Sequence, residues 1–488
     1  MAKEKTQAQL LVELGNELFD LRVNESGQVV GIPKDGPRIA RPLKGQGSVQ
    51  SSLVARFYQR FAKPPSTTAL MGAVSVLESG AGNQRPVRTP LRLARMADRL
   101  VIDMGDPEGR VILVGDGRWG LAAQAPEDVC FRRTSMTGAL PTPRRGGDVD
   151  LLRRVINVRT EDWPLIVAWL TCALLDVQTP ILALLGQQGS GKSFAGRVLV
   201  STVDPGLAPL RAMPHRPDDW AVTASGSHAF GLDNVSRIKP DMSDALCRAV
   251  TGEGYAKRSL YSNDDIHVLT YQRAMLLTSI DPGALQGDLG ERLIPVELRA
   301  IAPKRRRKES ELRAQAERIA PRVFGALLDL AAYVLANPVE LDEVPRMADA
   351  AHVMAALDAK RGTDTLDAYK RSAEIVINTV LESDPLAAAV VRLMQGRDQW
   401  RGTATSLLAD LTAVAVSDSF GRISNWPANA KLLSERLARM APALRDGPGL
   451  LVRRRRTTDR QIVLKWAEGA RRRGAITSST VKVRTHAR

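Results

Sequence analysis

The sequence predicts an α/β fold with a mainly parallel central sheet, preceded by an α+β module and followed by a winged-helix-like domain. Between residues 180 and 298, apolar strand-like runs alternate with helical patterns, as a parallel sheet with crossover helices requires. Before residue 149, helical patterns give way to short apolar alternations broken by Gly and Asp, which predict antiparallel strands. After residue 384 the order is helix, short extended segment, two helices and a hairpin, which is typical of a winged helix.

These changes of pattern also place the domain boundaries. The core is expected to begin with a long helix over 149–175. The five segments expected are an α+β module over 1–148, a parallel-sheet core over 149–300, a helical segment over 301–383, the winged-helix-like domain over 384–470 and a basic, disordered tail over 471–488.

The chain is strongly basic, with a formal net charge of +16 over 488 residues. Such a balance favours a polyanionic partner, and nucleic acid is the commonest one, so DNA is expected. The three cysteines and five histidines are scattered, which predicts neither a disulfide framework nor a zinc site. No apolar run reaches the roughly 18 residues of a membrane span, and residues 1–5 lack the apolar stretch of a signal peptide. We therefore expect a cytoplasmic protein without a membrane partner.

A glycine-rich motif follows directly on the apolar strand 180–185 and leads into a helix over 194–199. Glycines let such a loop wrap closely round an anion with its N–H groups pointing inward, and the helix N-terminus adds a positive potential. The lysine supplies a point charge for the β- and γ-phosphates, and the last serine hydroxyl suits Mg²⁺. The motif predicts ATP and Mg²⁺ as ligands, and it consists of Gly186, Gln187, Gln188, Gly189, Ser190, Gly191, Lys192 and Ser193.

A second acid must hold Mg²⁺ through water, and Asp233 stands at the end of an apolar strand where this acid is expected. Many such sites follow the acid with a glutamate that activates the attacking water, but here Asn234 follows. An asparagine can orient a water and cannot accept its proton. Either hydrolysis is slow, or the base comes from elsewhere, with Glu253 and Glu291 as candidates.

Three further features follow along the core. The extended runs 257–262 and 266–271 flank an acidic turn at 263–265 and predict a hairpin. The strand 273–279 ends in hydroxyls that could sense the γ-phosphate, with Ser279 in the last position. Arg292 then stands just before another predicted strand.

This order of parts resembles superfamily 3 helicases, which are AAA+-like motors of small viruses, phages and mobile elements. It is more similar still to ATP-binding proteins of actinobacterial prophages and integrative elements, in which similar runs to 232–236, 243–252 and 345–349 are expected. The resemblance covers residues 150 to 360 well and the N-terminal module loosely.

The resemblance implies a role for each matching residue. Lys192 and Ser193 would bind phosphate and Mg²⁺, Asp233 would bind the metal, and Ser279 stands where the family has a sensor asparagine. Arg292 matches the arginine that reaches the γ-phosphate of a neighbouring subunit in a hexameric ring; an ordinary surface ion pair is the alternative.

The predicted hairpin would line a DNA channel in a protein of this family. Lys257 or Arg258 on its strand would then touch phosphate, and a role without DNA contact stays equally open for both. The sequence departs from the family pattern at Asn234, at Ser279 and in the acidic hairpin turn.

The last fifth of the chain carries most of the net charge. Residues 384–488 contain 20 Lys and Arg against 8 Asp and Glu. The third predicted helix would present Lys431 and Arg439 to a major groove, and the hairpin arginines would lie along phosphates. A winged helix used for protein contacts is the alternative. The hairpin arginines are Arg453, Arg454, Arg455 and Arg456.

Three classes of function remain from these features. The first is a ring-forming, DNA-dependent ATPase, namely a superfamily 3-type helicase for phage or mobile-element replication. The second is a DNA-bound, ATP-controlled switch in a regulatory or defence protein, which unwinds nothing and is favoured by Asn234. A small-molecule P-loop kinase is disfavoured, because it has no use for the basic C-terminal domain and no acceptor-site pattern is evident.

Overall fold

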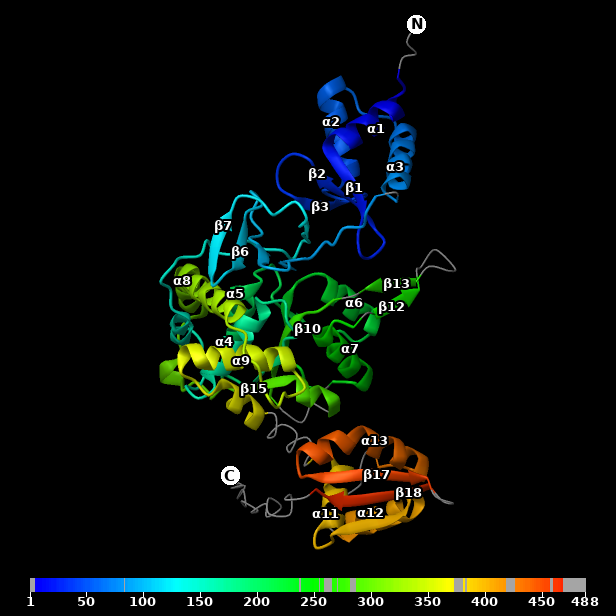
Figure 1. The fold of residues 1–488 in the computed structure, drawn as a ribbon, viewed down its shortest axis with the longest axis vertical. Coiled ribbons are helices and arrows are strands. Elements are labelled where there is room, and N and C mark those ends of the chain that lie inside the picture. The colour runs from blue at the N-terminus through cyan, green and yellow to red at the C-terminus, as the bar shows by residue number, and fades with distance from the viewer. Residues whose placement is uncertain are drawn as a thin grey trace, which may run out of the picture. The chain divides into compact units, whose positions relative to one another are not determined.

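The computed structural model describes residues 5–82, 84–236, 238–253, 255–258, 266–269, 271–280, 287–372, 381, 384–417, 426–456 and 460–467. The chain divides into two compact units (Figure 1). The first comprises residues 1–281 and 292–369, and the second comprises residues 282–291 and 370–488. The predicted acidic turn at 263–265 and the basic tail over 471–488 lie outside the described residues.

The chain begins with three helices packed on a small sheet. The first helix is α1 (Gln7–Leu18), where Thr6 and Gln9 form a capping box, and the second is α2 (Val49–Phe61). Helix α3 is Thr67–Ala81. Apolar side chains at helical spacing, such as Leu11 and Leu14, are fully buried between these elements. The strands of the sheet are, in spatial order, β1 (Phe19–Val23), β2 (Val29–Pro33), β3 (Ile39–Pro42) and β8 (Phe131–Arg132).

A second sheet follows as an antiparallel meander, as the short alternating runs predicted. Its strands are β4 (Leu93–Arg95), β5 (Leu100–Asp103), β6 (Val111–Gly115) and β7 (Arg118–Ala122).

Buried polar contacts attach this meander to the rest of the first unit. The Arg92 side chain is 1% exposed and donates to the Asp204 carboxylate at 2.8 Å and to the carbonyl of Gly138 at 2.9 Å. The Asp204 carboxylate in turn accepts hydrogen bonds from the backbone N–H groups of His228 and Ala229, at the start of a strand of the central sheet. Because breaking a buried ion pair leaves an uncompensated charge, this contact ties the meander firmly to the central sheet.

The centre of the first unit is a five-stranded parallel sheet with the order β10-β11-β14-β9-β15. Its outer strands β10 and β15 are labelled in Figure 1. Strands β9 and β14 are buried along their whole length, which accounts for their continuous apolar sequences. The strands are β9 (Ile181–Leu185), β10 (Leu210–Ala212), β11 (Ala229–Asp233), β14 (Ala274–Ser279) and β15 (Leu293–Glu297).

Helices flank this sheet, and one of them differs from the sequence prediction. Instead of a single helix over 149–175, a 3₁₀ helix η1 (Val149–Arg154) is followed by an irregular segment and then by α4 (Trp163–Ala173). Pro164 lies in the first turn of α4, where its missing N–H costs no helix hydrogen bond, so its position favours a helix that begins here. The other crossover helices are α5 (Lys192–Val203), α6 (Pro217–Ser225) and α7 (Pro240–Thr251).

The predicted hairpin is present as the antiparallel pair β12 (Tyr255–Arg258) and β13 (Ile266–Leu269). After β15 come η4 (Pro303–Arg305) and the helices α8 (Glu309–Ala336) and α9 (Ala348–Arg361). Short helix η3 (Gly287–Arg292) precedes β15.

Helix α8 is the one described helix long and apolar enough to cross a membrane by length and composition, and half of its apolar window is buried inside the protein. It packs against β6, β7, α5 and α9. The segment at Arg144 lies so close to the helix that Gly325 has no room for a Cβ, and Asp329 accepts a bond from the Trp119 indole. The apolar face of α8 is thus accounted for by packing within its unit.

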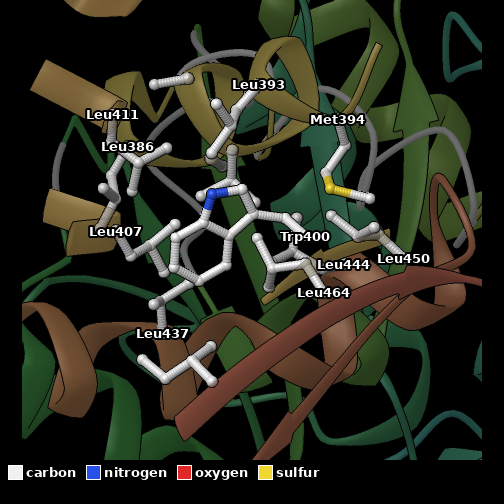
Figure 2. Packing of buried hydrophobic residues seen from close by; sticks show 14 of the residues in the cluster. Leu386, Leu393, Met394, Trp400, Leu407, Leu411, Leu437, Leu444, Leu450 and Leu464 are labelled. Atoms are coloured by element: carbon white, nitrogen blue, oxygen red, sulfur yellow. The ribbon is translucent and has the colours of Figure 1, made fainter. Parts of the chain in front are cut away.

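The second unit has its own core and the element order predicted for it. The three-stranded antiparallel sheet has the order β16-β18-β17, and the Trp400 ring lies among leucines from the surrounding helices (Figure 2). Its indole N–H donates to Asp410 at 2.8 Å. The elements are α11 (Pro385–Met394), β16 (Gln399–Thr403), α12 (Ala404–Ser417), α13 (Ala430–Asp446), β17 (Leu450–Arg456) and β18 (Arg460–Trp466).

Candidate functional site

The glycine-rich loop joins the carboxyl end of β9 to the first residue of α5. Gly186, Gly189 and Gly191 have φ angles of 147°, 78° and 85°, a region that residues with a side chain rarely adopt. A Cβ at position 186 would also collide with the carbonyl oxygen of Leu298, which follows β15. The sequence therefore needs glycine here for both backbone shape and space. The first N–H groups of α5, which have no intrahelical acceptor, lie at this loop.

Lys192 is half-buried and is the first residue of α5, at the end of the glycine-rich loop. Its ammonium group donates to the carbonyl oxygens of Gly186 at 2.6 Å and Gln187 at 2.9 Å. Burial lowers the pKa of this lysine, and the negative charge of Asp233 partly opposes that shift. The ammonium group is thus bonded to the loop backbone and lies within electrostatic range of the acid on β11.

Three side chains from three different elements meet beside the lysine. The Ser193 hydroxyl donates to Asp233 Oδ1 at 2.8 Å, and the Thr278 hydroxyl donates to the same oxygen at 2.6 Å. They meet because β14 lies between β9 and β11 in the sheet, so the carboxyl ends of all three strands share one edge. The two residues predicted to hold Mg²⁺, Ser193 and Asp233, are therefore brought together.

Of the two hydroxyls at the end of β14, Thr278 and not Ser279 reaches the acid. The Ser279 hydroxyl is 1% exposed and donates to the carbonyl of Val235 at 2.7 Å. Successive side chains of a strand point to opposite faces, so only one of the pair can face Asp233. The adjacent hydroxyls were visible in the sequence, but the choice between them depends on the facing strand.

Asn234 adopts a left-handed backbone conformation with a φ of 53°, and its N–H donates to the Thr278 hydroxyl at 2.8 Å. Asparagine visits this conformation more readily than longer side chains do. The backbone geometry thus gives a physical reason for asparagine, and against glutamate, after Asp233.

Asn157 is a site residue that the sequence analysis missed. Its side-chain amide donates to the carbonyl oxygens of Ser190 at 3.1 Å and Arg299 at 2.6 Å. Ile301 N–H donates to Gly189 O at 3.2 Å, so the segment after β15 lies along the glycine-rich loop. Asn157 lies in the irregular segment before α4, in no motif, and only the tertiary structure places it here.

The two candidate bases and the predicted arginine lie at the amino ends of the strands, opposite the end of the sheet that carries the glycine-rich loop. Arg292 precedes Leu293, which pairs with Ile181 at the start of β9, about 13 Å of strand away from the glycine-rich loop. Glu291 adjoins Arg292 in the chain. Glu253 follows the end of α7. There the Thr251 carbonyl accepts a hydrogen bond from the side chain of Gln178, which lies just before β9 begins. All three therefore lie away from the glycine-rich loop of the same chain.

The Arg292 side chain is 7% exposed, so the single chain buries it almost fully.

A cleft of about 630 Å³ opens beside the acid on β11, at the carboxyl ends of β10 and β11. It is mixed in charge, because both carboxylates and cationic groups line it. The lining includes Asp233, Asn234, Asp241, Lys239, Arg211 and His215.

In the second unit, the predicted contact residues of α13 are on its surface. Lys431 and Arg439 are exposed, whereas Leu433 and Leu437 of the same helix are buried in the core. Arg453 and Arg454 on β17 are exposed, and the Arg454 guanidinium donates to the carbonyl of Ser434 on α13. Strand β17 and the surface of α13 are therefore adjacent.

Four of the basic residues predicted to contact DNA have only their backbone described. Arg455 and Arg456 lie in β17, and Lys257 and Arg258 lie in β12. Their side chains lie outside the described part of the chain.

The fold defines a mixed α/β protein built on a parallel sheet with a glycine-rich strand–loop–helix turn. Residues 149–378 match the family model "Actinomycete integrative conjugative element replication protein", and residues 386–479 match the model "AICE RepA C-terminal domain". Together these two models cover about two thirds of the 488 residues. Over these residues the chain belongs to the replication proteins of actinomycete integrative conjugative elements. The prediction of a mobile-element replication protein is thereby confirmed.

Solved structures with a similar arrangement include helicases. The structure described as "SCCmec type IV Cch - active helicase" is 12% identical, with 93% of this chain and 94% of that chain covered and a TM-score of 0.45. The apo structure of the NrS-1 C-terminal region is 11% identical, with 95% and 99% covered and a TM-score of 0.39. The JCV helicase structure is 14% identical, with 46% and 67% covered and a TM-score of 0.23. No curated protein sequence matches the chain.

Proposed function

We propose that the first unit is a P-loop ATPase that binds ATP with Mg²⁺ at the loop 186–193. The observation that carries the proposal is the convergence of Lys192, Ser193, Asp233 and Thr278 at one edge of the sheet. A loop of backbone N–H groups, an ammonium group and a helix N-terminus together suit a polyphosphate.

The residues present fit a Mg²⁺ ion. Ser193 and Asp233 offer a hydroxyl and a carboxylate oxygen 2.8 Å apart, and Mg²⁺ prefers a few oxygen ligands with water completing its shell. When bound, the ion would neutralise charge on the β- and γ-phosphates. Thr278 holds the Asp233 carboxylate in place, and Lys192 contributes a positive charge to the γ-phosphate.

The second unit is proposed to be a winged helix that binds DNA. Three helices, a three-stranded antiparallel sheet and exposed cations on α13 and β17 support this assignment. Lys431 and Arg439 would face a groove, and Arg453 and Arg454 would lie along the backbone. Lys257 and Arg258 are proposed as a second contact with DNA, on the hairpin of the first unit.

The whole chain is proposed to be a replicative helicase-like motor that works as a hexameric ring in the cytoplasm. Membership in a replication family of mobile elements supports the replicative role. Arg292 lies at the amino end of β15, away from its own glycine-rich loop, so a role at a nucleotide would require the loop of a neighbouring subunit. Because its side chain is 7% exposed in one chain, assembly would have to bring the neighbour's nucleotide to it.

Asn234 favours a second candidate, an ATP-controlled switch that binds DNA and unwinds nothing. An amide next to the metal-binding acid cannot accept the proton of the attacking water. Slow turnover would suit a protein whose bound nucleotide controls assembly.

Strand displacement separates the two candidates. We expect the full chain to release the labelled strand of a forked DNA with ATP and Mg²⁺, and not with a non-hydrolysable ATP analogue. The Lys192→Ala variant serves as the control for contaminating helicases. Nucleotide-dependent DNA binding without any strand release would instead support the switch.

Asn157 should control how well the loop binds nucleotide. Replacing Asn157 with Ala removes two hydrogen bonds, one to the loop carbonyl of Ser190 and one to Arg299 in the segment beside the loop, each worth about 1 kcal/mol. We expect the KM for ATP to rise about 5- to 30-fold, with kcat less affected. Steady-state ATPase assays over a range of ATP concentrations measure both. Asn337→Ala, which removes a similar bond to the Tyr333 carbonyl at the end of α8, should leave KM unchanged.

A further inference from the structure

The proposed ATPase lacks a proton acceptor at the position after Asp233. The structure limits the positions from which another side chain could accept the proton. Asn234 carries an amide, and the two glutamates considered from the sequence lie at the opposite edge of the sheet. A general base must come within hydrogen-bond reach of the attacking water, directly or through one water. A base supplied by the same chain must therefore lie at the carboxyl ends of the strands, near Asp233.

Among the described residues that line the cleft beside Asp233, two carry carboxylates, and the second is Asp241. Asp233 Oδ1 already accepts bonds from the hydroxyls of Ser193 and Thr278, so that acid is engaged. Asp241 is exposed to the cleft that Asn234 also lines.

The position of Asp241 in the fold suits a fixed catalytic group. It lies in the first turn of α7, and the next residue, Met242, is 4% exposed and anchors that turn in the protein. Side chains on a rigid element hold a reactive geometry more closely than side chains on loops do. His215, which lines the same cleft, is exposed in the irregular segment after β10 and lacks such support.

We propose that Asp241 is the general base of ATP hydrolysis, in place of the missing glutamate after Asp233. This inference rests on the proposed ATPase function. A water oxygen forms the new bond to the γ-phosphorus, its proton passes to the Asp241 carboxylate, and the bond from the γ-phosphorus to the bridging oxygen of ADP breaks. Asp241 then returns the proton to solvent. Asn234 orients the water through its amide.

The test compares Asp241→Asn with Asp244→Asn in the full chain, with DNA present. Both replacements remove one exposed carboxylate from α7, but Asp244 does not line the cleft. For Asp241→Asn we expect kcat to fall about 100-fold or more, within the range that general bases contribute. Binding of a non-hydrolysable ATP analogue should stay within about twofold of wild type, because a base acts on the transition state. Asp244→Asn should behave like wild type in both measurements.

Two further variants keep the result decisive. Asp241→Glu retains a carboxylate and should recover part of the lost kcat, which a merely structural role of Asp241 would not predict. Melting curves show whether each variant is folded, and a misfolded Asp241→Asn is replaced in the comparison by Asp241→Ser.

Turnover by folded Asp241→Asn at the wild-type rate would overturn the assignment and leave the ATPase proposal intact. In that case His215→Asn would identify a base in the same cleft, and Glu253→Gln or Glu291→Gln would identify one supplied across a subunit interface. A wild-type chain that binds ATP and never hydrolyses it would overturn both proposals. Loss of analogue binding in Lys192→Ala, alongside normal binding in Asp241→Asn, separates the two roles.

Discussion

Replacing Lys192 with Ala is expected to lower ATP turnover by about 100-fold or more, a loss of the size seen when one preorganised electrostatic contact is removed from an active site. The lysine ammonium lies 2.6 Å from the loop carbonyl of Gly186, within the loop that would hold the phosphates. Its charge is therefore placed where negative charge accumulates during phosphoryl transfer. Phosphate release over time measures the rate, and nucleotide titration measures binding.

Arg197→Ala provides the matched control for this variant. Arg197 is a cation on the same helix, α5, and it pairs with Glu309 on α8 and not with the loop. The pair is partly exposed, so its removal should change stability by no more than about 1 kcal/mol. Undiminished turnover in Lys192→Ala, or an equal loss in Arg197→Ala, would contradict the proposed nucleotide site.

Replacing Arg453, Arg454, Arg455 and Arg456 with Ser is expected to flatten the salt dependence of duplex binding. Each phosphate neutralised on a DNA duplex contributes a slope of about −0.9 in a plot of log affinity against log salt concentration. If three of the four arginines contact phosphates, the slope should become less steep by roughly 2 to 3 units. Fluorescence anisotropy with a labelled duplex at several salt concentrations measures this slope.

The control for the wing variant removes the same charge elsewhere. Arg56, Arg60, Lys63 and Arg85 are exposed in the N-terminal module, and replacing these four with Ser lowers the net charge equally. A general effect of net charge would change both slopes alike. An unchanged slope in the wing variant would mean that the wing faces protein or solvent, and DNA binding would then depend on the hairpin residues Lys257 and Arg258.

Several features of this protein could be predicted from local sequence alone. The apolar run of β9, the glycines that follow and the start of α5 are contiguous, so the motif specifies its own backbone geometry. The alternation of strands and helices likewise predicted a mainly parallel sheet, because the strand and helix patterns are each contained in a short, contiguous segment. The helix predicted over 149–175 was wrong between Arg154 and Trp163, where the chain is irregular before Pro164 occupies the first turn of a new helix.

The sequence by itself determined the glycine-rich loop motif, the acid at 233, the order of elements in the basic C-terminal unit and the strong positive charge. Only the tertiary structure decided which side chains meet. The pairing of β14 between β9 and β11 brings Thr278 to Asp233, and an irregular segment brings Asn157 to the loop. Helix α7 carries Asp241 to the cleft that Asp233 also lines, and the helix ends before Glu253 at the amino ends of the strands. Strand order and the direction of each side chain depend on contacts between residues far apart in the chain, and periodicity within one segment carries no information about them.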